Sequence, residues 1–142
     1  MQAVFKQTEG DYLEAVIEVA GQSLTVMDEF GGDSLTYGEI IDIELSIGIA
    51  CEQEDQNTML AGNPEGLRQL QHIQGWSYRA FGTITDITQG AVIDVGLCRL
   101  EAPFDSNISG ESIAFTILRL DARLYQAQTD ALKLVAESFA IE

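Results

Sequence analysis

The segment from Ile41 to Ala50 constrains the fold of this chain more than any other. Aliphatic side chains stand at every second position from Ile41 to Ile49, and polar or small residues stand between them. A period of two is typical of a β-strand with one buried face, whereas a helix repeats every three to four residues. A slip of one residue would expose the whole aliphatic set to water, so the register is well determined. We expect most of Ile41, Ile43, Leu45 and Ile47 to be buried.

Weaker alternation of the same kind predicts further strands. Residues 12–28 and 76–97 each have the pattern of a hairpin, and residues 113–121 that of a last long strand. The sequence therefore predicts a mainly β protein with minor α content, built as a small antiparallel barrel or sandwich of about six strands. The strand order resembles that of an OB-like barrel with an extra strand, a likeness of fold that implies no function.

Helical signals occur at two places. Before residues 64–74, Asn63 is a suitable N-terminal cap and Pro64 suits the first helical position. Residues 124–139 place apolar side chains at helical spacing, and a terminal strand over 131–141 is the alternative. We therefore expect a short middle helix and a C-terminal helix.

The length of 142 residues is typical of a single domain, 1–142. Residues 11–50 and 76–121 follow a similar plan of strand, turn, strand, polar loop and long strand, joined by residues 51–75. This likeness predicts an internal β-β-β repeat, although any series of short strands looks somewhat repetitive. Residues 51–62, at the start of the connection, are polar and are expected to be irregular.

The charge of the chain is large and unevenly distributed. Asp and Glu number 23 against 7 Lys and Arg, a formal net charge of −16, and no Lys or Arg lies between Gln7 and Leu67. A surface this acidic argues against binding to nucleic-acid phosphates and to anionic membranes. A basic protein partner would explain the charge, and so would solubility through self-repulsion.

The predicted contact surface is the outer face of the first strands, where acidic side chains alternate with the apolar ones and have few local counter-charges. The candidate partner-binding residues are Glu14, Glu18, Asp42 and Glu44, with Trp76 as an aromatic anchor. Core packing is the alternative for Trp76. We expect basic residues of the second half to pair with acidic residues of the first: Arg79, Arg99, Arg119 and Arg123.

Few residues indicate catalysis. The chain has one histidine, His72, predicted to lie at the surface, and it has neither a nucleophile elbow nor a phosphate-binding loop. The loop beginning at Asp105 matches the first half of an EF-hand, but Thr116 stands where the bidentate Glu should be. The sequence therefore predicts no catalytic residue, no cofactor and no metal site.

Cysteine usage and hydropathy bear on location. Cys51 and Cys98 have the setting of reduced, buried thiols. An apolar leader is not visible after Met1, and no apolar run has the length of a membrane span. We therefore expect a cytoplasmic protein that does not contact a membrane.

Together these features favour a non-catalytic acidic binding or accessory protein whose N-terminal half meets a basic protein partner. An immunity-type inhibitor is the sharpest version, because inhibitors that neutralise nucleases are often small and acidic. The alternative is a small-ligand carrier or an enzyme that uses carboxylates at the mouth of the barrel. A cavity lined by converging carboxylates would favour the alternative, and a flat anionic face the binding protein. The sequence leaves the oligomeric state open.

Overall fold

The protein is mainly β in the computed structural model, which describes residues 1–9, 13–104 and 109–125. The first strands are β1 (Gln2–Glu9), β2 (Glu14–Val19), β3 (Gln22–Glu29) and β4 (Ile40–Ala50), with a turn of 3₁₀ helix, η2 (Gly32–Ser34), before β4. The later elements are α1 (Gln56–Ala61), β5 (Gln69–Gln74), β6 (Ser77–Asp86), β7 (Val92–Asp94), β8 (Arg99–Glu101) and β9 (Ser112–Leu124). All the strands within the described residues belong to one sheet, which is antiparallel except where β3 meets β9.

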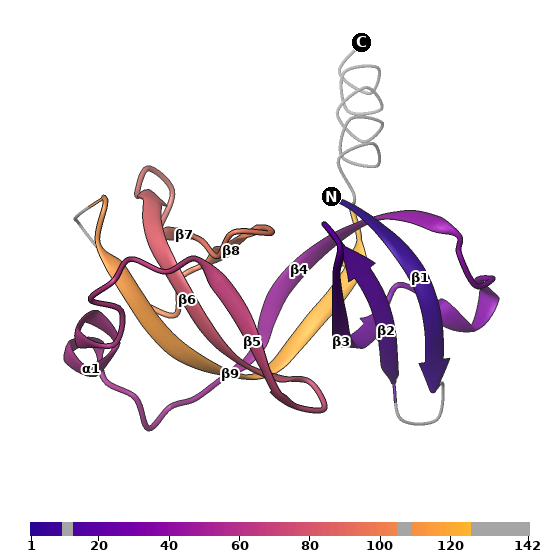
Figure 1. Ribbon diagram of the computed structural model, residues 1–142, viewed down its shortest axis with the longest axis horizontal. Helices are drawn as coiled ribbons and strands as arrows, with labels where there is room; N and C mark the ends of the chain where they lie inside the picture. The colour runs from indigo at the N-terminus through magenta and orange to yellow at the C-terminus, as the bar shows by residue number, and fades with distance from the viewer. Residues whose placement is uncertain (10–12, 105–108, 126–142) are drawn as a thin grey trace, which may run out of the picture.

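The sheet is bent into two lobes that share the long strands β4 and β9 (Figure 1). We call the first lobe β1 to β4 with the C-terminal part of β9, and the second lobe α1 and β5 to β8 with the N-terminal part of β9. Residues 112–117 of β9 pair with β6, and residues 117–124 pair with β4. One strand thus joins the two lobes through continuous main-chain hydrogen bonding.

The pairings of the first lobe form a ring. The antiparallel pairs β4–β1, β1–β2 and β2–β3 lead to β3, which pairs in parallel with β9, and β9 pairs in turn with β4. In the second lobe the order β9-β6-β7-β8 ends at β8, which pairs only with β7 within the described residues. The first lobe therefore returns to its starting strand, and the second has a free edge.

The structure confirms the strands expected from alternation. The hairpin of β2 and β3 turns at Ala20 and Gly21, both with positive φ (50° and 80°), as two-residue hairpins prefer. In β4, Ile41, Ile43 and Leu45 are buried. Farther along β4 the register shifts, and Ile49 is exposed. The hairpin over 76–97 corresponds to β6 and β7, and the last long strand corresponds to β9.

The prediction of a helix over residues 64–74 is wrong, because residues 69–74 form β5, paired with β6. Asn63 does not cap a helix. Its side-chain amide donates to the Leu67 carbonyl (2.9 Å), and its oxygen accepts from the Leu67 N–H (2.8 Å). Gly66, with φ of 68°, continues the turn in a left-handed conformation. The helix lies instead at α1, in the segment expected to be irregular.

Other boundaries of the structure were also missed from the sequence. Strands β1, β5 and β8 were not expected, so the described sheet has more strands than the predicted six or so. Leu124, expected to begin a C-terminal helix, ends β9. The remainder of that helix, and the alternative strand over 131–141, lie outside the described residues. The internal repeat and the single domain stay predictions.

Most of the buried apolar side chains form one hydrophobic cluster that extends through both lobes. Tyr78 of β6 links the lobes, because its hydroxyl accepts a hydrogen bond from the Thr25 N–H of β3 (2.7 Å) and donates one to the Thr25 carbonyl (2.9 Å). Gln22 of β3 also reaches the second lobe, donating to the Leu70 carbonyl of β5 (2.9 Å). These hydrogen bonds from β3 to β5 and β6 therefore hold the two lobes together.

Candidate functional site

Most of the acidic residues predicted to bind a partner have counter-charges in the fold. Glu18 of β2 forms an ion pair with Lys6 (3.4 Å), and Asp42 of β4 pairs with the amino group of Met1 (3.0 Å). Glu44 of β4 pairs with Arg123 of β9. Glu14 makes no hydrogen bond or ion pair within the described residues. Three of these four residues thus find a counter-charge on another strand, which the local sequence pattern could not show.

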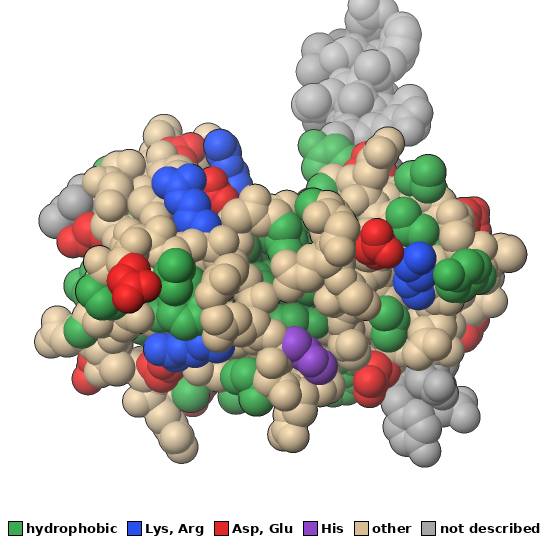
Figure 2. Space-filling model, in the orientation of Figure 1, with side chains coloured by type: hydrophobic (Ala, Val, Ile, Leu, Met, Phe, Trp, Pro, Cys, Tyr) green, Lys and Arg blue, Asp and Glu red, His purple; other side chains and the backbone are tan. Residues whose placement is uncertain are grey.

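Other acidic residues of the first half stabilise local structure. Asp28 accepts from the Thr8 hydroxyl (2.9 Å) and the Gly32 N–H (3.0 Å), which fixes the loop after β3. Asp55 caps α1 by accepting from the Thr58 N–H (2.7 Å), and this hydrogen bond lowers the pKa of Asp55. Several acidic residues of the first half thus stabilise the fold. Figure 2 shows acidic side chains scattered over the visible face of both lobes.

The arginines confirm part of the predicted pairing between the two halves. Arg79 pairs with Glu54 (2.7 Å), and Arg123 pairs with Glu44. Arg119 was expected to pair with the first half, but it pairs with Asp121 on its own strand (2.7 and 3.0 Å). Arg99 makes no ion pair within the described residues.

The Asp121 carboxylate is nearly buried, and Gly48 of β4 makes room for it. A Cβ atom at residue 48 would lie 2.2 Å from the Asp121 Oδ2 atom. Residue 48 falls where the β4–β9 register shifts, close to the place where the two lobes join. The absence of a side chain at residue 48 therefore makes the Arg119–Asp121 ion pair sterically possible.

Trp76 lies just before β6, in the second lobe, and is half-buried. Its carbonyl accepts a hydrogen bond from the Leu120 N–H of β9 (3.0 Å). Its indole N–H is buried and has no hydrogen-bond partner within the described residues. The acidic candidates Glu14, Glu18 and Asp42 belong to the first lobe, so the structure divides the predicted surface between the two lobes.

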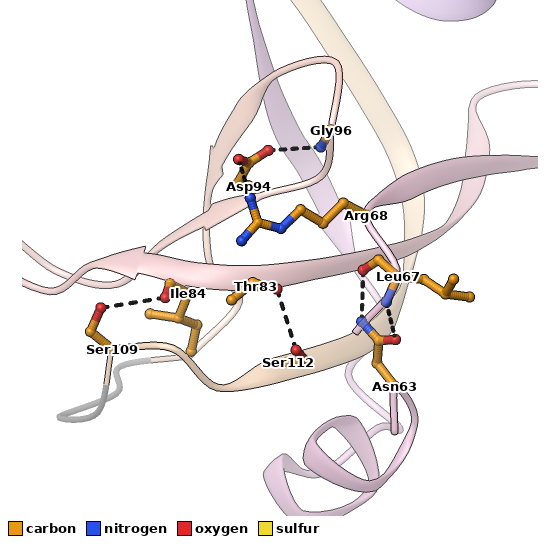
Figure 3. Close-up of polar contacts among 9 residues, drawn as sticks. All are labelled: Asn63, Leu67, Arg68, Thr83, Ile84, Asp94, Gly96, Ser109 and Ser112. Carbon is orange, nitrogen blue, oxygen red and sulfur yellow. Dashed lines mark hydrogen bonds and ion pairs between the residues drawn. The ribbon is translucent and has the colours of Figure 1, made fainter. Parts of the chain in front are cut away.

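A polar cluster braces the second lobe (Figure 3). The buried Asn63 amide binds the loop at Leu67 and also donates to the Ile113 carbonyl of β9 (3.2 Å). Arg68 pairs with Asp94 (3.0 Å), whose other oxygen accepts from the Gly96 N–H (2.8 Å). These groups satisfy one another, so we assign this cluster a structural role.

A cleft of about 460 Å³ lies between β4 and β8, and its volume is in the range of small-molecule sites. Its apolar lining includes Ile47, Val92 and Leu100. Its charged lining consists of Glu44, Arg99, Glu101 and Arg123. The carboxylates that converge here are therefore matched by an equal number of guanidinium groups.

The charged groups of the cleft interact with one another and with the strands around it. The hydrogen bond from Arg123 to Glu44 raises the pKa of Arg123, with smaller contributions from Glu29 and Glu101. The hydrogen bonds from Thr88 lower the pKa of Asp86, and the charge of Arg99 adds a smaller effect in the same direction. Arg123 is therefore paired with Glu44, whereas Arg99 makes no ion pair within the described residues.

The two cysteine thiols and the His72 imidazole do not line this cleft. Burial raises the pKa of the Cys98 thiol to about 12, so it stays protonated at neutral pH and is a poor nucleophile. The His72 ring is exposed and lies 2.7 Å from the Gly75 carbonyl, and Cys51 is a free thiol. Within the described residues, no three His, Cys, Asp or Glu side chains are grouped to hold a metal ion.

Comparison with known proteins adds no relative: no protein-family model, no curated protein and no solved structure matches the chain. In the part of the chain that the structure describes, no helix has the length and apolar character needed to cross a bilayer. Sequence reasoning missed the cleft, because Ser46, Arg99 and Glu101 carry no motif. Only the return of β8 towards β4 places them together.

Proposed function

We propose that this chain is a non-catalytic binding protein that engages a basic protein partner through its anionic surface. An immunity-type inhibitor remains the most specific form of this proposal. Its support is the net charge of −16 together with the carboxylates that have no bonded partner within the described residues. In the first half these are Glu14, Glu29, Asp33, Glu52 and Glu65. Location in the cytoplasm stays a prediction.

These carboxylates differ from the ones that fix loops or caps, because the fold makes no evident use of them. Their combined field would attract a cationic surface and accelerate encounter. Glu29 is only partly free, because its charge acts on Arg119 and Arg123. Glu52 and Glu65 flank α1 in the second lobe. The proposed contact surface is therefore in the first lobe, at Glu14 and Asp33 together with the predicted residues Glu18, Asp42 and Glu44.

We also propose that the ring of the first lobe is an OB-like barrel, with the second lobe inserted between its fourth and fifth strands. The support is the ring order β1-β2-β3-β9-β4 and its single parallel pair, β3–β9. This likeness concerns architecture alone, because one barrel fold serves many functions.

A small-ligand carrier or an enzyme is the alternative function, and its structural support among the described residues is the cleft between β4 and β8. Its carboxylates, Glu44 and Glu101, are balanced by Arg99 and Arg123. Balanced charges suit the binding of a ligand. A catalytic general base would instead need a carboxylate with a raised pKa.

Charge neutralisation in each lobe separately tests the proposed function. The first variant carries the sequence-predicted changes Glu14→Gln, Glu18→Gln, Asp42→Asn and Glu44→Gln. The matched control removes the same charge from the second lobe with Glu52→Gln, Glu65→Gln, Asp86→Asn and Glu111→Gln. Partners are captured from the native lysate at low ionic strength, and association rates are then measured with the purified partner.

The first variant should slow association by about tenfold, and the control should slow it much less, because the field near the contact dominates steering. Both variants should remain folded by circular dichroism, since exposed ion pairs contribute only about 0–1 kcal/mol each. Equal association by both variants and the unmodified chain at low salt would contradict the anionic contact surface. An effect of the control alone would move the contact to the second lobe.

A further inference from the structure

The wall of the cleft formed by β7 and β8 has one charge of each sign. Arg99 and Glu101 are two residues apart on β8, so their side chains lie on the same face of the strand, and both line the cleft. Val92 of β7 pairs with Glu101, shares this face and lines the cleft as well. This wall therefore offers a guanidinium, a carboxylate and an apolar side chain next to one another.

The Arg99 guanidinium makes no hydrogen bond or ion pair within the described residues. Asp94 lies opposite Arg99 on β7, but its carboxylate is paired with Arg68 (3.0 Å). Asp86 feels the charge of Arg99, but its carboxylate is bonded to the Thr88 N–H (2.8 Å). Both nearby carboxylates thus have other donors, and Arg99 keeps its own donors for a ligand.

The Glu101 carboxylate is in the same position. It is exposed and accepts no hydrogen bond from any described residue. Its cationic neighbour is Arg123, whose guanidinium is bonded to Glu44, and Glu101 adds only a smaller electrostatic effect on the pKa of Arg123. Glu44 and Arg123 therefore neutralise each other, and Arg99 and Glu101 are left as one unpaired charge of each sign within the described part of the cleft.

The wall formed by β4 adds a neutral polar group and apolar surface. Ser46 is half-buried and lines the cleft, and its hydroxyl has no hydrogen-bond partner within the described residues. Ile47, which is also half-buried, lines the cleft beside it. The volume of about 460 Å³ suits a small molecule, and a mainly apolar lining with a few polar groups is typical of such sites.

The two unpaired charges favour a ligand that has both signs itself. A purely cationic or purely anionic ligand would be attracted by one of Arg99 and Glu101 and repelled by the other. A zwitterion satisfies both groups through charge-assisted hydrogen bonds. Its net charge is zero, so the net charge of −16 on the protein does not repel it.

We propose that the cleft binds a small zwitterion with an apolar side chain, of which a hydrophobic α-amino acid is the simplest. Its carboxylate lies on Arg99, its ammonium group on Glu101, and its side chain against Ile47 and Val92. Residues two apart on a strand are separated by about 7 Å. The long side chains of Arg99 and Glu101 can therefore contact the two charged groups of one such molecule. This site goes beyond the proposed function, because Arg99 and Glu101 are not part of the contact surface.

Leucine and two of its derivatives serve as probes. Leucinamide lacks the carboxylate, N-acetylleucine lacks the ammonium group, and both keep the apolar side chain. Amide resonances of the ¹⁵N-labelled full chain are followed as each compound is added. Leucine should shift the amides of Ser46, Arg99 and Glu101, and each derivative should bind about tenfold more weakly, because charge-assisted hydrogen bonds are the stronger ones.

Two substitutions assign the ends of the ligand. Arg99→Gln should weaken leucine binding about tenfold and remove the preference for leucine over leucinamide, while the preference over N-acetylleucine remains. Glu101→Gln should have the converse effect. Lys6→Gln and Glu65→Gln remove the same charges away from the cleft and should leave the binding of all three compounds unchanged.

Several results would overturn this site. They are absence of leucine binding, equal binding of leucine and either derivative to the unmodified chain, and amide shifts that lie outside the cleft. The comparison of the three compounds needs no substitution, so it tests the site even if a variant fails to fold. None of these results changes the capture of a basic partner, which depends on carboxylates of the first lobe. Failure of that capture would contradict the proposed function and leave the result for leucine standing.

Discussion

The two lobes use the same long strands, β4 and β9, but they treat their edges differently. In the first lobe β3 reaches β9 through residues 27–29, so every strand of the ring has a neighbour on both sides. In the second lobe the short strand β8 faces β4 without pairing to it. Strand edges are liabilities that folds usually cover. The second lobe therefore keeps an unpaired strand edge, whereas the first lobe pairs every strand of its ring on both sides.

The largest expected effect tests whether the closed lobe is the more rigid of the two. Ile43 is fully buried in the first lobe, and Leu100 is 2% exposed on β8. Ile43→Ala should lower the free energy of unfolding by about 2–5 kcal/mol, with Leu100→Ala near the lower end, because the open edge can relax into the space. Denaturant unfolding measures both. An equal or larger loss for Leu100→Ala would contradict the expectation that the first lobe is the more rigid of the two.

A substitution at the junction of the lobes should have the next largest effect. Gly48→Ala would place its Cβ atom 2.2 Å from the Asp121 carboxylate, so the Arg119–Asp121 pair must move. We expect a loss of about 3 kcal/mol in the free energy of unfolding, at the upper end of overpacking costs.

The control for Gly48→Ala is the same change in an Asp121→Ala background, where the clash is absent. In that background Gly48→Ala should cost much less than in the unmodified chain. The difference between the two costs is the coupling energy between residues 48 and 121. Equal costs in the two backgrounds would show that the contact at Asp121 is not the reason for a glycine at residue 48.

The smallest effect concerns the link between the lobes at Tyr78. Tyr78→Phe removes the two hydrogen bonds to Thr25 and should cost on the order of 1–2 kcal/mol. Burial raises the pKa of Tyr78 to about 12, from 10.0 for an exposed tyrosine. The neutral hydroxyl therefore stabilises the fold fully below pH 10, and this contribution is lost as the pH rises towards 12.

The free energy of unfolding, measured between pH 9 and pH 12, tests whether stability falls as the Tyr78 hydroxyl ionises. The unmodified chain should lose more stability over this window than Tyr78→Phe, which has no hydroxyl to titrate at that position. Parallel pH profiles for the two proteins would mean that the Tyr78 hydroxyl does not carry the pH dependence.

Local patterns predicted much of the fold, and the errors have identifiable causes. The alternation from Ile41 to Leu45 predicted the buried face of β4, because the period of a strand depends only on neighbouring residues. Asn63 and Pro64 imitated a helix start, but the Asn63 amide is bonded to Leu67 and to strands far away in the sequence. A local capping signal cannot reveal that its side chain has a better partner elsewhere.

The sequence by itself determined the β character, the register of β4 and the excess of negative charge, since each depends on composition or on short-range spacing. Only the tertiary structure decided how that charge is used. Glu44 meets Arg123, and Glu54 meets Arg79, because strand pairing brings these residues together. The cleft is also a tertiary property. Ser46 and Arg99 become neighbours of one space only when the sheet bends and β8 returns towards β4, and no local pattern encodes such a return.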